Sequence, residues 1–255
     1  MAHIGIFDSG SGGLSVYREL VKVLPKERYT YFADNACCPY GEKTALYICR
    51  RGRFITEFLL DKGADIIVVA CNTATAAAIA TLRSEYPDVP FIGMEPAVKP
   101  AALGTRSGVI GVLATAGTLK GSKYLNTRGL FEDDVTIVEH VGQGFVELVE
   151  NGILDGPEAE SVVRASLQPL LDAGADTIVL GCTHYPFLQP LIQRLSGPGV
   201  QVIDPAPAVA RQTVRVLEQR GIPTGQGPFS IELNASGPPD SLNRIFSFID
   251  TAHEH

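Results

Sequence analysis

Short apolar runs recur along the chain, and most are followed by a segment long enough to form a helix. The apolar runs occupy residues 4–7, 29–33, 66–70, 91–94, 109–113, 135–138, 178–180 and 200–203. Helix-length segments between them include residues 43–62, about 73–84, 157–173 and 206–220. Strands that are apolar throughout, alternating with helices, predict an α/β fold of mostly parallel sheets buried by helices on both faces.

The chain contains an internal repeat. Residues 59–71 align without gaps on residues 170–182, and nine of the thirteen positions are identical. A weaker match aligns residues 4–9 with residues 110–115. A helix end, a glycine and a strand are a common α/β combination, but this does not explain a cysteine at the same strand end in both matches. We therefore predict two copies of one α/β unit, forming two pseudo-symmetric lobes with a cleft between them.

Composition narrows the class of protein. Apolar residues make up 45% and charged residues 19% of 255 residues, as in ordinary globular proteins of one large domain or two modest ones. A net charge of −7 without a basic block argues against nucleic acid or an anionic membrane as a partner. The uncharged stretch 66–82 contains Asn72 and several threonines and is short for a membrane span, so no transmembrane helix is expected.

The five cysteines are more informative than the bulk composition. Their number is odd, and Asp8 interrupts the first apolar run, which argues against a secretory signal. A disulfide framework is therefore not expected. The sequence predicts reduced thiols and a cytoplasmic location.

Two of these cysteines, Cys71 and Cys182, stand at the carboxyl ends of predicted strands, where α/β sheets bind ligands. Each precedes a predicted helix, whose free N–H groups should lower the pKa of the thiol toward neutrality. Either cysteine alone could simply be a small buried hydrophobic residue. Two cysteines related by the repeat, both followed by hydrogen-bonding residues, favour a catalytic pair.

Several chemistries use thiols, and most fit this sequence poorly. Zinc is disfavoured because no C-x-x-C pair is present and Cys37 and Cys38 are adjacent. A redox dithiol would also use C-x-x-C. A single nucleophile paired with His184 would leave Cys71 without a task. Racemisation fits best, because one thiolate removes an α-proton while a thiol on the opposite face delivers another.

Several motifs follow one another along the chain. They are Asp8, Ser9, Gly10, Gly12 and Gly13, then residues 39–43, 70–74, 149–152 and 181–186. Together they resemble the motifs of the bacterial glutamate racemase family, and the resemblance covers essentially the whole chain, less strongly after about residue 219. The resemblance implies a racemase that needs neither cofactor nor metal and supplies D-glutamate for peptidoglycan.

The resemblance also implies a role for individual residues. Cys71 and Cys182 match the two catalytic thiols, Asp8 matches the group that assists Cys71, and His184 with Glu150 matches the pair that assists Cys182. The expected substrate contacts are Asp8, Ser9, Tyr40, Gly41, Asn72, Thr73, Thr183 and His184. Structural alternatives remain open: Asp8 or His184 could serve only a helix start, Glu150 could be a surface carboxylate, and Tyr40 could be pocket wall. Cys37, Cys38 and Cys49 receive no role.

Some alternatives remain open at the level of the molecule. A related racemase could act on aspartate or another small amino acid. Less favoured are a dinucleotide-binding oxidoreductase, with Asp34 as the ribose-binding acid, and a non-enzymatic two-lobed binding protein. The resemblance implies a discontinuous first lobe, residues 1–96 and 207–255, and a second lobe, residues 97–206. A homodimer is the assembly expected for an enzyme of this size.

Overall fold

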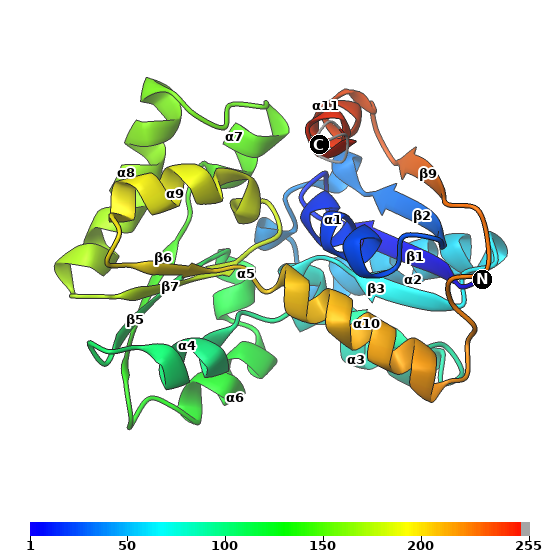
Figure 1. Cartoon of the computed structure of the whole chain (residues 1–255), viewed down its shortest axis with the longest axis horizontal. Coiled ribbons are helices and arrows are strands. Elements are labelled where there is room, and N and C mark those ends of the chain that lie inside the picture. The colour runs from blue at the N-terminus through cyan, green and yellow to red at the C-terminus, as the bar shows by residue number, and fades with distance from the viewer. Residues whose placement is uncertain (251–255) are drawn as a thin grey trace.

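The structure, a computed structural model, describes residues 1–250 and contains two parallel sheets flanked by helices (Figure 1). The strands are β1 (His3–Asp8), β2 (Arg28–Ala33), β3 (Ile66–Val69), β4 (Phe91–Gly93), β5 (Val109–Ala114), β6 (Thr136–Val141), β7 (Thr177–Gly181), β8 (Gln201–Ile203) and β9 (Ser230–Ala235). The α-helices are α1 (Leu14–Val23), α2 (Ala45–Asp61), α3 (Asn72–Glu85), α4 (Val98–Gly104), α5 (Ala116–Leu119), α6 (Ser122–Gly129), α7 (Phe145–Glu150), α8 (Pro157–Asp172), α9 (Gln189–Ser196), α10 (Ala206–Gln219) and α11 (Asp240–Asp250). Three short 3₁₀ helices are η1 (Asn35–Cys37), η2 (Tyr40–Glu42) and η3 (Tyr185–Leu188).

The two sheets repeat one topology. The first sheet has the strand order β4-β3-β1-β2-β9 and the second has the order β6-β5-β7-β8. Read from its other edge, the second sheet matches the first four strands of the first, with β5 in the place of β1 and β7 in the place of β3. All pairings are parallel. The predicted α/β fold with two pseudo-symmetric units is therefore confirmed.

Within each unit, the segments from the two sequence matches of the repeat contact each other. A Cβ on Gly5 of β1 would stand 3.2 Å from Leu59 of α2, and a Cβ on Gly111 of β5 would stand 2.9 Å from Leu170 of α8. These pairs occupy equivalent positions in the repeat. In both units a glycine in the central strand lets a helix leucine pack directly onto the sheet, because a side chain there would collide with it.

Alternating side chains of the strands enter different cores. On the first sheet, Ile4 and Ile6 belong to the cluster that includes α1 and α10, whereas Phe7 belongs to the cluster beneath α2 and α3. The second sheet is likewise covered by α8 and α9 on one face and by α4 and α6 on the other. Covering both faces explains the nearly continuous apolar runs of the central strands.

Two strands differ from the expectation of burial on both faces. β6 begins one residue later and ends three residues later than predicted, and its side chains are only partly buried or exposed; β8 is similar. Both lie at the edges of the second sheet. At both edges of this sheet the helices cover the strands incompletely, unlike the edge strand β4 of the first sheet, whose Phe91 and Ile92 are buried.

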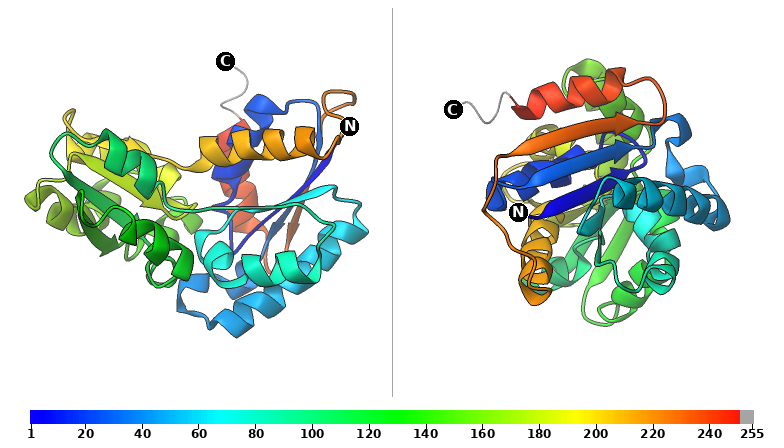
Figure 2. Two further views of the ribbon diagram at one scale, coloured as in Figure 1. Left: turned by 90° about the horizontal axis from the view of Figure 1, so that it is seen from below. Right: turned by 90° about the vertical axis from the view of Figure 1, so that its right-hand side faces the viewer.

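After the second sheet the chain returns to the first. α10 packs against α1, and β9 pairs with β2 in parallel, as the orange and blue strands of Figure 2 show. Residues 251–255 of the predicted first lobe lie outside the described residues. Among residues 1–250, no helix combines the length and the hydrophobicity that crossing a membrane requires.

Candidate active site

The residues predicted to form the site converge on one small pocket between the two sheets. Its lining contains nine of them: Ser9, Tyr40, Gly41, Cys71, Asn72, Thr73, Cys182, Thr183 and His184. Pro39, Thr115 and Val146 complete it. The pocket encloses about 10 Å³, which is room for roughly one water molecule. Asp8 and Glu150 stand behind the lining and contact it through hydrogen bonds, so the structure brings all eleven residues together.

Cys71 follows β3 and is the N-cap residue of α3. Its Sγ accepts a hydrogen bond from the backbone N–H of Ala74 at 3.4 Å and lies 3.8 Å from the hydroxyl of Ser9. Behind them the carboxylate of Asp8 accepts hydrogen bonds from the N–H groups of Gly10 and Gly13. The helix start predicted at this thiol is therefore present.

The thiol at this helix start does not have the lowered pKa that its position predicts. Burial raises the pKa of Cys71 well above its ordinary value, and the negative charge of Asp8 raises it further. The hydrogen bonds from Ala74 and Ser9 act in the opposite direction but are outweighed. Burial also raises the pKa of Asp8. Burial and Asp8 therefore favour a protonated Cys71, the form that can donate a proton.

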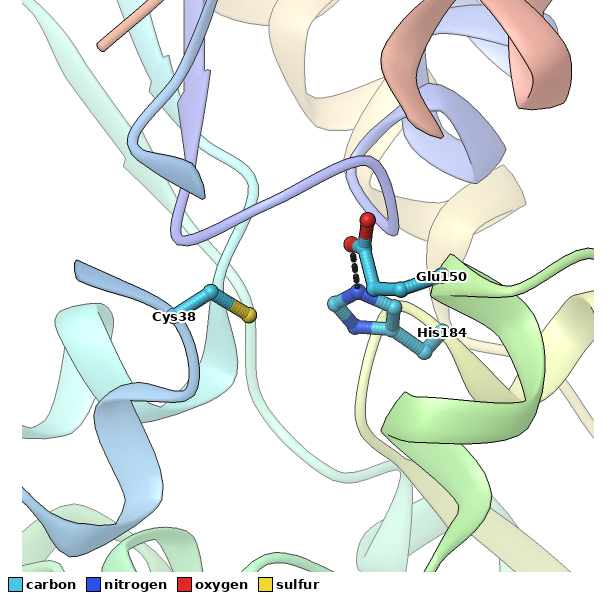
Figure 3. A group of neighbouring side chains, drawn as sticks. All are labelled: Cys38, Glu150 and His184. Carbon is cyan, nitrogen blue, oxygen red and sulfur yellow. Dashed lines mark hydrogen bonds and ion pairs between the residues drawn. The ribbon is translucent and has the colours of Figure 1, made fainter. Parts of the chain in front are cut away.

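Cys182 follows β7, and the helix after it is a 3₁₀ turn, η3, rather than an α-helix. The ring of His184 lies beside the thiol, with Nδ1 3.7 Å from Sγ of Cys182. The opposite nitrogen, Nε2, lies 2.7 Å from Oε1 of Glu150 (Figure 3). A thiol, an imidazole and a carboxylate thus form a continuous chain.

Within the row formed by Cys182, His184 and Glu150, His184 and Glu150 each stabilise the charged form of the other. Although burial alone would lower the pKa of His184, Cys182 and Glu150 raise it well above its ordinary value. Burial would raise the pKa of Glu150, but hydrogen bonds and the charge of His184 lower it to about 2. Both directions indicate an imidazolium–carboxylate pair. An imidazolium at His184 places an N–H donor, Nδ1, beside Sγ of Cys182.

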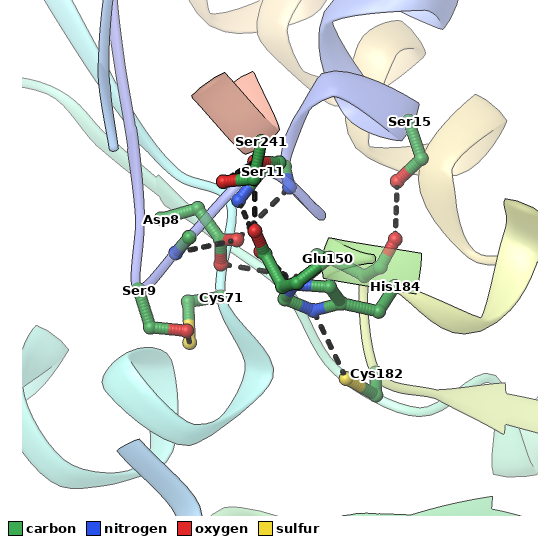
Figure 4. A network of polar contacts seen from close by, with 12 residues as sticks. Asp8, Ser9, Ser11, Ser15, Cys71, Glu150, Cys182, His184 and Ser241 are labelled. Carbon is green, nitrogen blue, oxygen red and sulfur yellow. Dashed lines mark hydrogen bonds and ion pairs between the residues drawn. The ribbon is translucent and has the colours of Figure 1, made fainter. Parts of the chain in front are cut away.

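Glu150 also connects the two lobes. Its oxygens accept hydrogen bonds from the backbone N–H and the hydroxyl of Ser11, at 2.7 and 3.0 Å, and the Ser11 hydroxyl oxygen lies 3.3 Å from that of Ser241 of α11 (Figure 4). Ser15 of α1 donates to the carbonyl of Thr183 across the same boundary. The geometry around Cys182 therefore depends on segments that belong to the first sheet.

The glycine-rich turn after β1 provides close approach between side chains. A Cβ on Gly12 would stand 2.4 Å from Nδ1 of His184, and one on Gly10 would stand 2.4 Å from Oε1 of Glu150. A Cβ on Gly13 would stand 2.7 Å from Cβ of Asp8. The space that a dinucleotide phosphate would need over this turn is occupied by these side chains, which argues against the oxidoreductase alternative.

Asp34, the residue expected to bind a ribose in the oxidoreductase alternative, already has hydrogen-bond partners within the protein. Its buried carboxylate accepts two hydrogen bonds from Arg51, at 2.7 and 2.8 Å, and one from the hydroxyl of Tyr40. Burial acts to raise the pKa of Asp34, but these donors keep it below its ordinary value. The ion pair between Asp34 and Arg51 therefore fixes the carboxylate to which Tyr40 donates, and it holds Tyr40 and the turn η2 in place as one wall of the pocket.

Polar groups of the pocket remain available for a ligand. Both side-chain atoms of Asn72, Nδ2 and Oδ1, are buried without a hydrogen-bond partner among the described residues. Buried polar groups are nearly always paired, so an unpaired amide in a pocket indicates a ligand contact. Thr73 and Thr183 add hydroxyls, and Thr183 also donates to Asp8 at 3.3 Å.

Two nearby residues escaped the sequence prediction. Thr115 lines the pocket, and its hydroxyl lies 2.8 Å from that of Thr73. The repeat could have identified it, because Thr115 aligns with Ser9. Cys38 lies beside Glu150 and His184, just before the Pro-Tyr-Gly segment. Cys37 and Cys49 instead contact Tyr47 and the carbonyl of Ala77. All five cysteines are free thiols.

Comparisons with known proteins agree with this geometry. The family model described as "Asp/Glu/Hydantoin racemase" matches residues 4–213. A protein named glutamate racemase from Ectopseudomonas mendocina is 53% identical over 97% of this chain and 94% of its own length.

Solved structures give the same result. Glutamate racemase isoform RacE1 from Bacillus anthracis superposes with a TM-score of 0.87 at 33% identity, covering 97% of this chain and 93% of that one. Glutamate racemase from Escherichia coli, solved with L-glutamate and the activator UDP-MurNAc-Ala, gives a TM-score of 0.85 at 33% identity over 97% and 95% of the two chains. With two equivalent thiols facing one pocket and relatives of this similarity along nearly its whole length, the chain belongs to the glutamate racemase family within the Asp/Glu/hydantoin racemases.

Proposed function

We propose that this protein interconverts L- and D-glutamate by two-base proton transfer between Cys71 and Cys182. The observation that carries the proposal is the meeting of both thiols, from equivalent strand ends of the two units, in one pocket. Full-length similarity to proteins named glutamate racemase, and the L-glutamate bound to the Escherichia coli relative, support glutamate as the substrate.

The reaction follows from the unequal surroundings of the two thiols. The thiolate of Cys182, beside the imidazolium of His184, removes the α-proton from one face of the substrate. The thiol of Cys71, kept protonated by burial and by Asp8, delivers a proton to the other face. In the reverse direction the two thiols exchange roles. No step requires a cofactor or a metal.

A basic thiolate alone cannot remove the α-proton of glutamate fast enough. The α-hydrogen of an amino acid is a very weak acid, so the developing carbanion needs electrostatic stabilisation in a site closed to water. The amide of Asn72 and the hydroxyls of Ser9, Thr73 and Thr183 are buried around the pocket. We propose that they hold the two carboxylates of glutamate and that Tyr40 and Gly41 close the pocket over it.

The wider assignments belong to the same proposal. The lobes comprise residues 1–96 with 207–255 and residues 97–206. A reducing, cytoplasmic location keeps both thiols active, and D-glutamate would supply peptidoglycan synthesis. A homodimer is expected and is tested by measuring the molar mass in solution with light scattering.

The decisive experiment follows hydrogen exchange at the α-carbon. The protein is incubated with L-glutamate, and separately with D-glutamate, in D₂O without added cofactor. Proton NMR should show loss of the α-hydrogen signal, and circular dichroism should show decay of optical activity from either enantiomer. Cys71→Ser and Cys182→Ser should each abolish racemisation, whereas Cys49→Ser, which changes a thiol outside the pocket, should not. Folded protein that exchanges neither enantiomer would contradict the proposal, and faster turnover of aspartate would reassign the substrate.

A further inference from the structure

Cys38 has no part in the proton transfers, yet its thiol faces two groups that do. Sγ of Cys38, a carboxylate oxygen of Glu150 and a ring nitrogen of His184 all lie within 4.8 Å of one another (Figure 3). Cys38 comes from the segment between η1 and η2, Glu150 from the end of α7 and His184 from the start of η3. No two cysteines close in sequence have the C-x-x-C spacing of a zinc site. The fold brings these three ligand types together from distant segments.

We propose that Cys38, Glu150 and His184 form an inhibitory zinc site. One sulfur, one imidazole nitrogen and one carboxylate oxygen are the ligands that Zn²⁺ prefers, whereas Mg²⁺ and Ca²⁺ prefer oxygen alone. Three protein ligands leave the fourth tetrahedral position for water. The carboxylates of Glu150 and of the nearby Asp8 favour a divalent cation over an anion at this place.

The surroundings allow an ion to enter and to be held. A cavity of about 280 Å³ opens beside the cluster and includes Cys38, Glu150, Asn35 and Ser241 in its wall. It provides both an entry path that avoids the catalytic pocket and room for the water ligand. The second oxygen of Glu150 stays hydrogen-bonded to the hydroxyl of Ser11, which orients the carboxylate.

Coordination requires a small rearrangement. Nε2 of His184 and Oε1 of Glu150 are now 2.7 Å apart and share a hydrogen bond. Zinc bonds of about 2.0 Å at a tetrahedral centre set neighbouring ligands roughly 3.3 Å apart, so this pair must open by about 0.6 Å. The ion displaces the proton on Nε2 and the proton of the Cys38 thiol, and both protons leave to solvent.

Zinc bound here would stop the proposed reaction in two ways. It takes His184 and Glu150 away from the hydrogen-bonded chain that assists Cys182. It also ties the Cys38 segment, which is continuous with the first sheet, to residues that belong to the second. Lobes joined in this way cannot separate to admit substrate. The inhibition rests on the proposed racemase function, whereas zinc binding does not.

The test measures binding and activity separately on the full chain, reduced and freed of metal with a chelator. Zinc is titrated in competition with a chromophoric indicator, and Co²⁺ is titrated separately while the thiolate-to-cobalt absorption in the near ultraviolet is recorded. We expect one zinc ion per chain and a cobalt–thiolate band. Cys38→Ser should weaken zinc binding by at least about 10-fold and remove that band. Cys37→Ser is the matched control, because its thiol contacts Tyr47 instead, and should bind zinc as the unsubstituted protein does.

Activity supplies the second measurement. Zinc should inhibit racemisation by the unsubstituted protein and by Cys37→Ser, and a chelator should restore it. Cys38→Ser should retain its activity, which also shows that it folds, and should resist zinc. Equal zinc affinity in Cys38→Ser would overturn the site, as would zinc binding that is lost in Cys71→Ser but kept in Cys38→Ser, because the ion would then lie at the catalytic thiols. Zinc binding without any racemase activity would leave the site standing and count against the proposed function.

Discussion

The two thiols occupy equivalent positions but have different neighbours. Cys182 faces the imidazolium of His184, whereas Cys71 faces the buried carboxyl of Asp8. The alignment of residues 4–9 with residues 110–115 accounts for part of this inequality, because Ala114 takes the place of Asp8 in the second unit. It does not predict the raised pKa of Cys71. The pKa is raised because the thiol is buried between the two lobes, and this burial depends on the folded structure rather than on the local helix start.

Gly12 tests how closely the first lobe must approach His184. We expect Gly12→Ala to lower kcat/KM by about 10- to 100-fold, because the added methyl group would stand 2.4 Å from Nδ1 and push the ring away from Cys182. The measurement is racemisation followed by circular dichroism, with thermal unfolding as the check on folding.

Gly199→Ala is the matched control for this substitution. Nothing in the described structure lies within 4 Å of a Cβ at that position, so the added methyl group meets no neighbour there. Its activity should stay within about twofold of the unsubstituted protein, as expected for a surface change. Unimpaired activity of Gly12→Ala would mean that the position of His184 is not essential.

At the scale of elements, the repeated Gly-Ala-Asp segment has a structural task. Asp65 accepts a hydrogen bond from the backbone N–H of His3, at the start of β1. Its equivalent, Asp176, accepts from the N–H groups of Arg106 and Ser107, just before β5. In both units the carboxylate at the end of one loop fixes the beginning of the central strand. This part of the repeat therefore reflects folding, whereas we propose that the cysteines are repeated for proton transfer.

Asp176→Asn should lower the free energy of unfolding by about 1 kcal/mol. The effect is small because solvent partly screens this carboxylate. Burial acts to raise its pKa, but hydrogen bonds from Thr105, Arg106 and Ser107 lower it from 3.8 to about 2. Since the folded pKa is lower, the stabilisation is present above pH 4 and is lost as the pH falls from about 4 to about 2.

Urea unfolding at pH 7 and at pH 2 checks this prediction. The difference between Asp176→Asn and the unsubstituted protein should be present at pH 7 and much smaller at pH 2. Asp172→Asn serves as the control, since among residues 1–250 that exposed carboxylate accepts a side-chain hydrogen bond only from Gln168 in its own helix. An equal loss of stability in the two variants at pH 7 would show that the contacts of Asp176 before β5 do not stabilise the fold.

The arrangement of elements could be predicted further than the site. Hydrophobic runs and the repeat predict nearly every strand, because central strands covered on both faces leave a strong apolar signal. They misplace β6, because this edge strand is only half covered. They also give no sign of Cys38, whose neighbours Glu150 and His184 lie more than a hundred residues away in sequence. Contacts between lobes depend on tertiary geometry that no local pattern encodes.

At the scale of the whole molecule, the structure shows the pocket closed. The turn η2 lies against α5, and a Cβ on Gly41 would be 3.4 Å from Cβ of Thr115. Larger cavities of about 530 and 410 Å³ lie outside this contact, and both include Gly41 in their walls. Glutamate is far larger than the space inside, so the proposed function requires this contact to open during each turnover.

A disulfide across this contact should lock the protein shut. The Gly41→Cys, Thr115→Cys double variant would place its two Cβ atoms 3.4 Å apart, close to the separation of about 3.5–4.5 Å that is typical of disulfides. Under mild oxidation we expect racemisation to fall by at least about 10-fold and to recover with a reductant. Mass spectrometry of peptides from the oxidised protein verifies the cross-link.

The two single variants are the controls, because they report any damage from the substitutions or from oxidation of the native thiols. Each should keep the same activity before and after oxidation and reduction. Full activity in the cross-linked double variant would show that substrate enters without parting η2 from α5.

Thermodynamics limits how far the different surroundings of the two thiols can affect the reaction. Enantiomers of glutamate have equal free energies in water, so the equilibrium constant is one, and kcat/KM must be identical in the two directions whatever surrounds each thiol. His184, Glu150 and Asp8 therefore cannot make the enzyme favour one enantiomer at equilibrium. They can only divide the same specificity constant differently, giving one direction a higher kcat and a proportionally higher KM. The asymmetry of the site sets the concentration of each enantiomer at which the enzyme saturates.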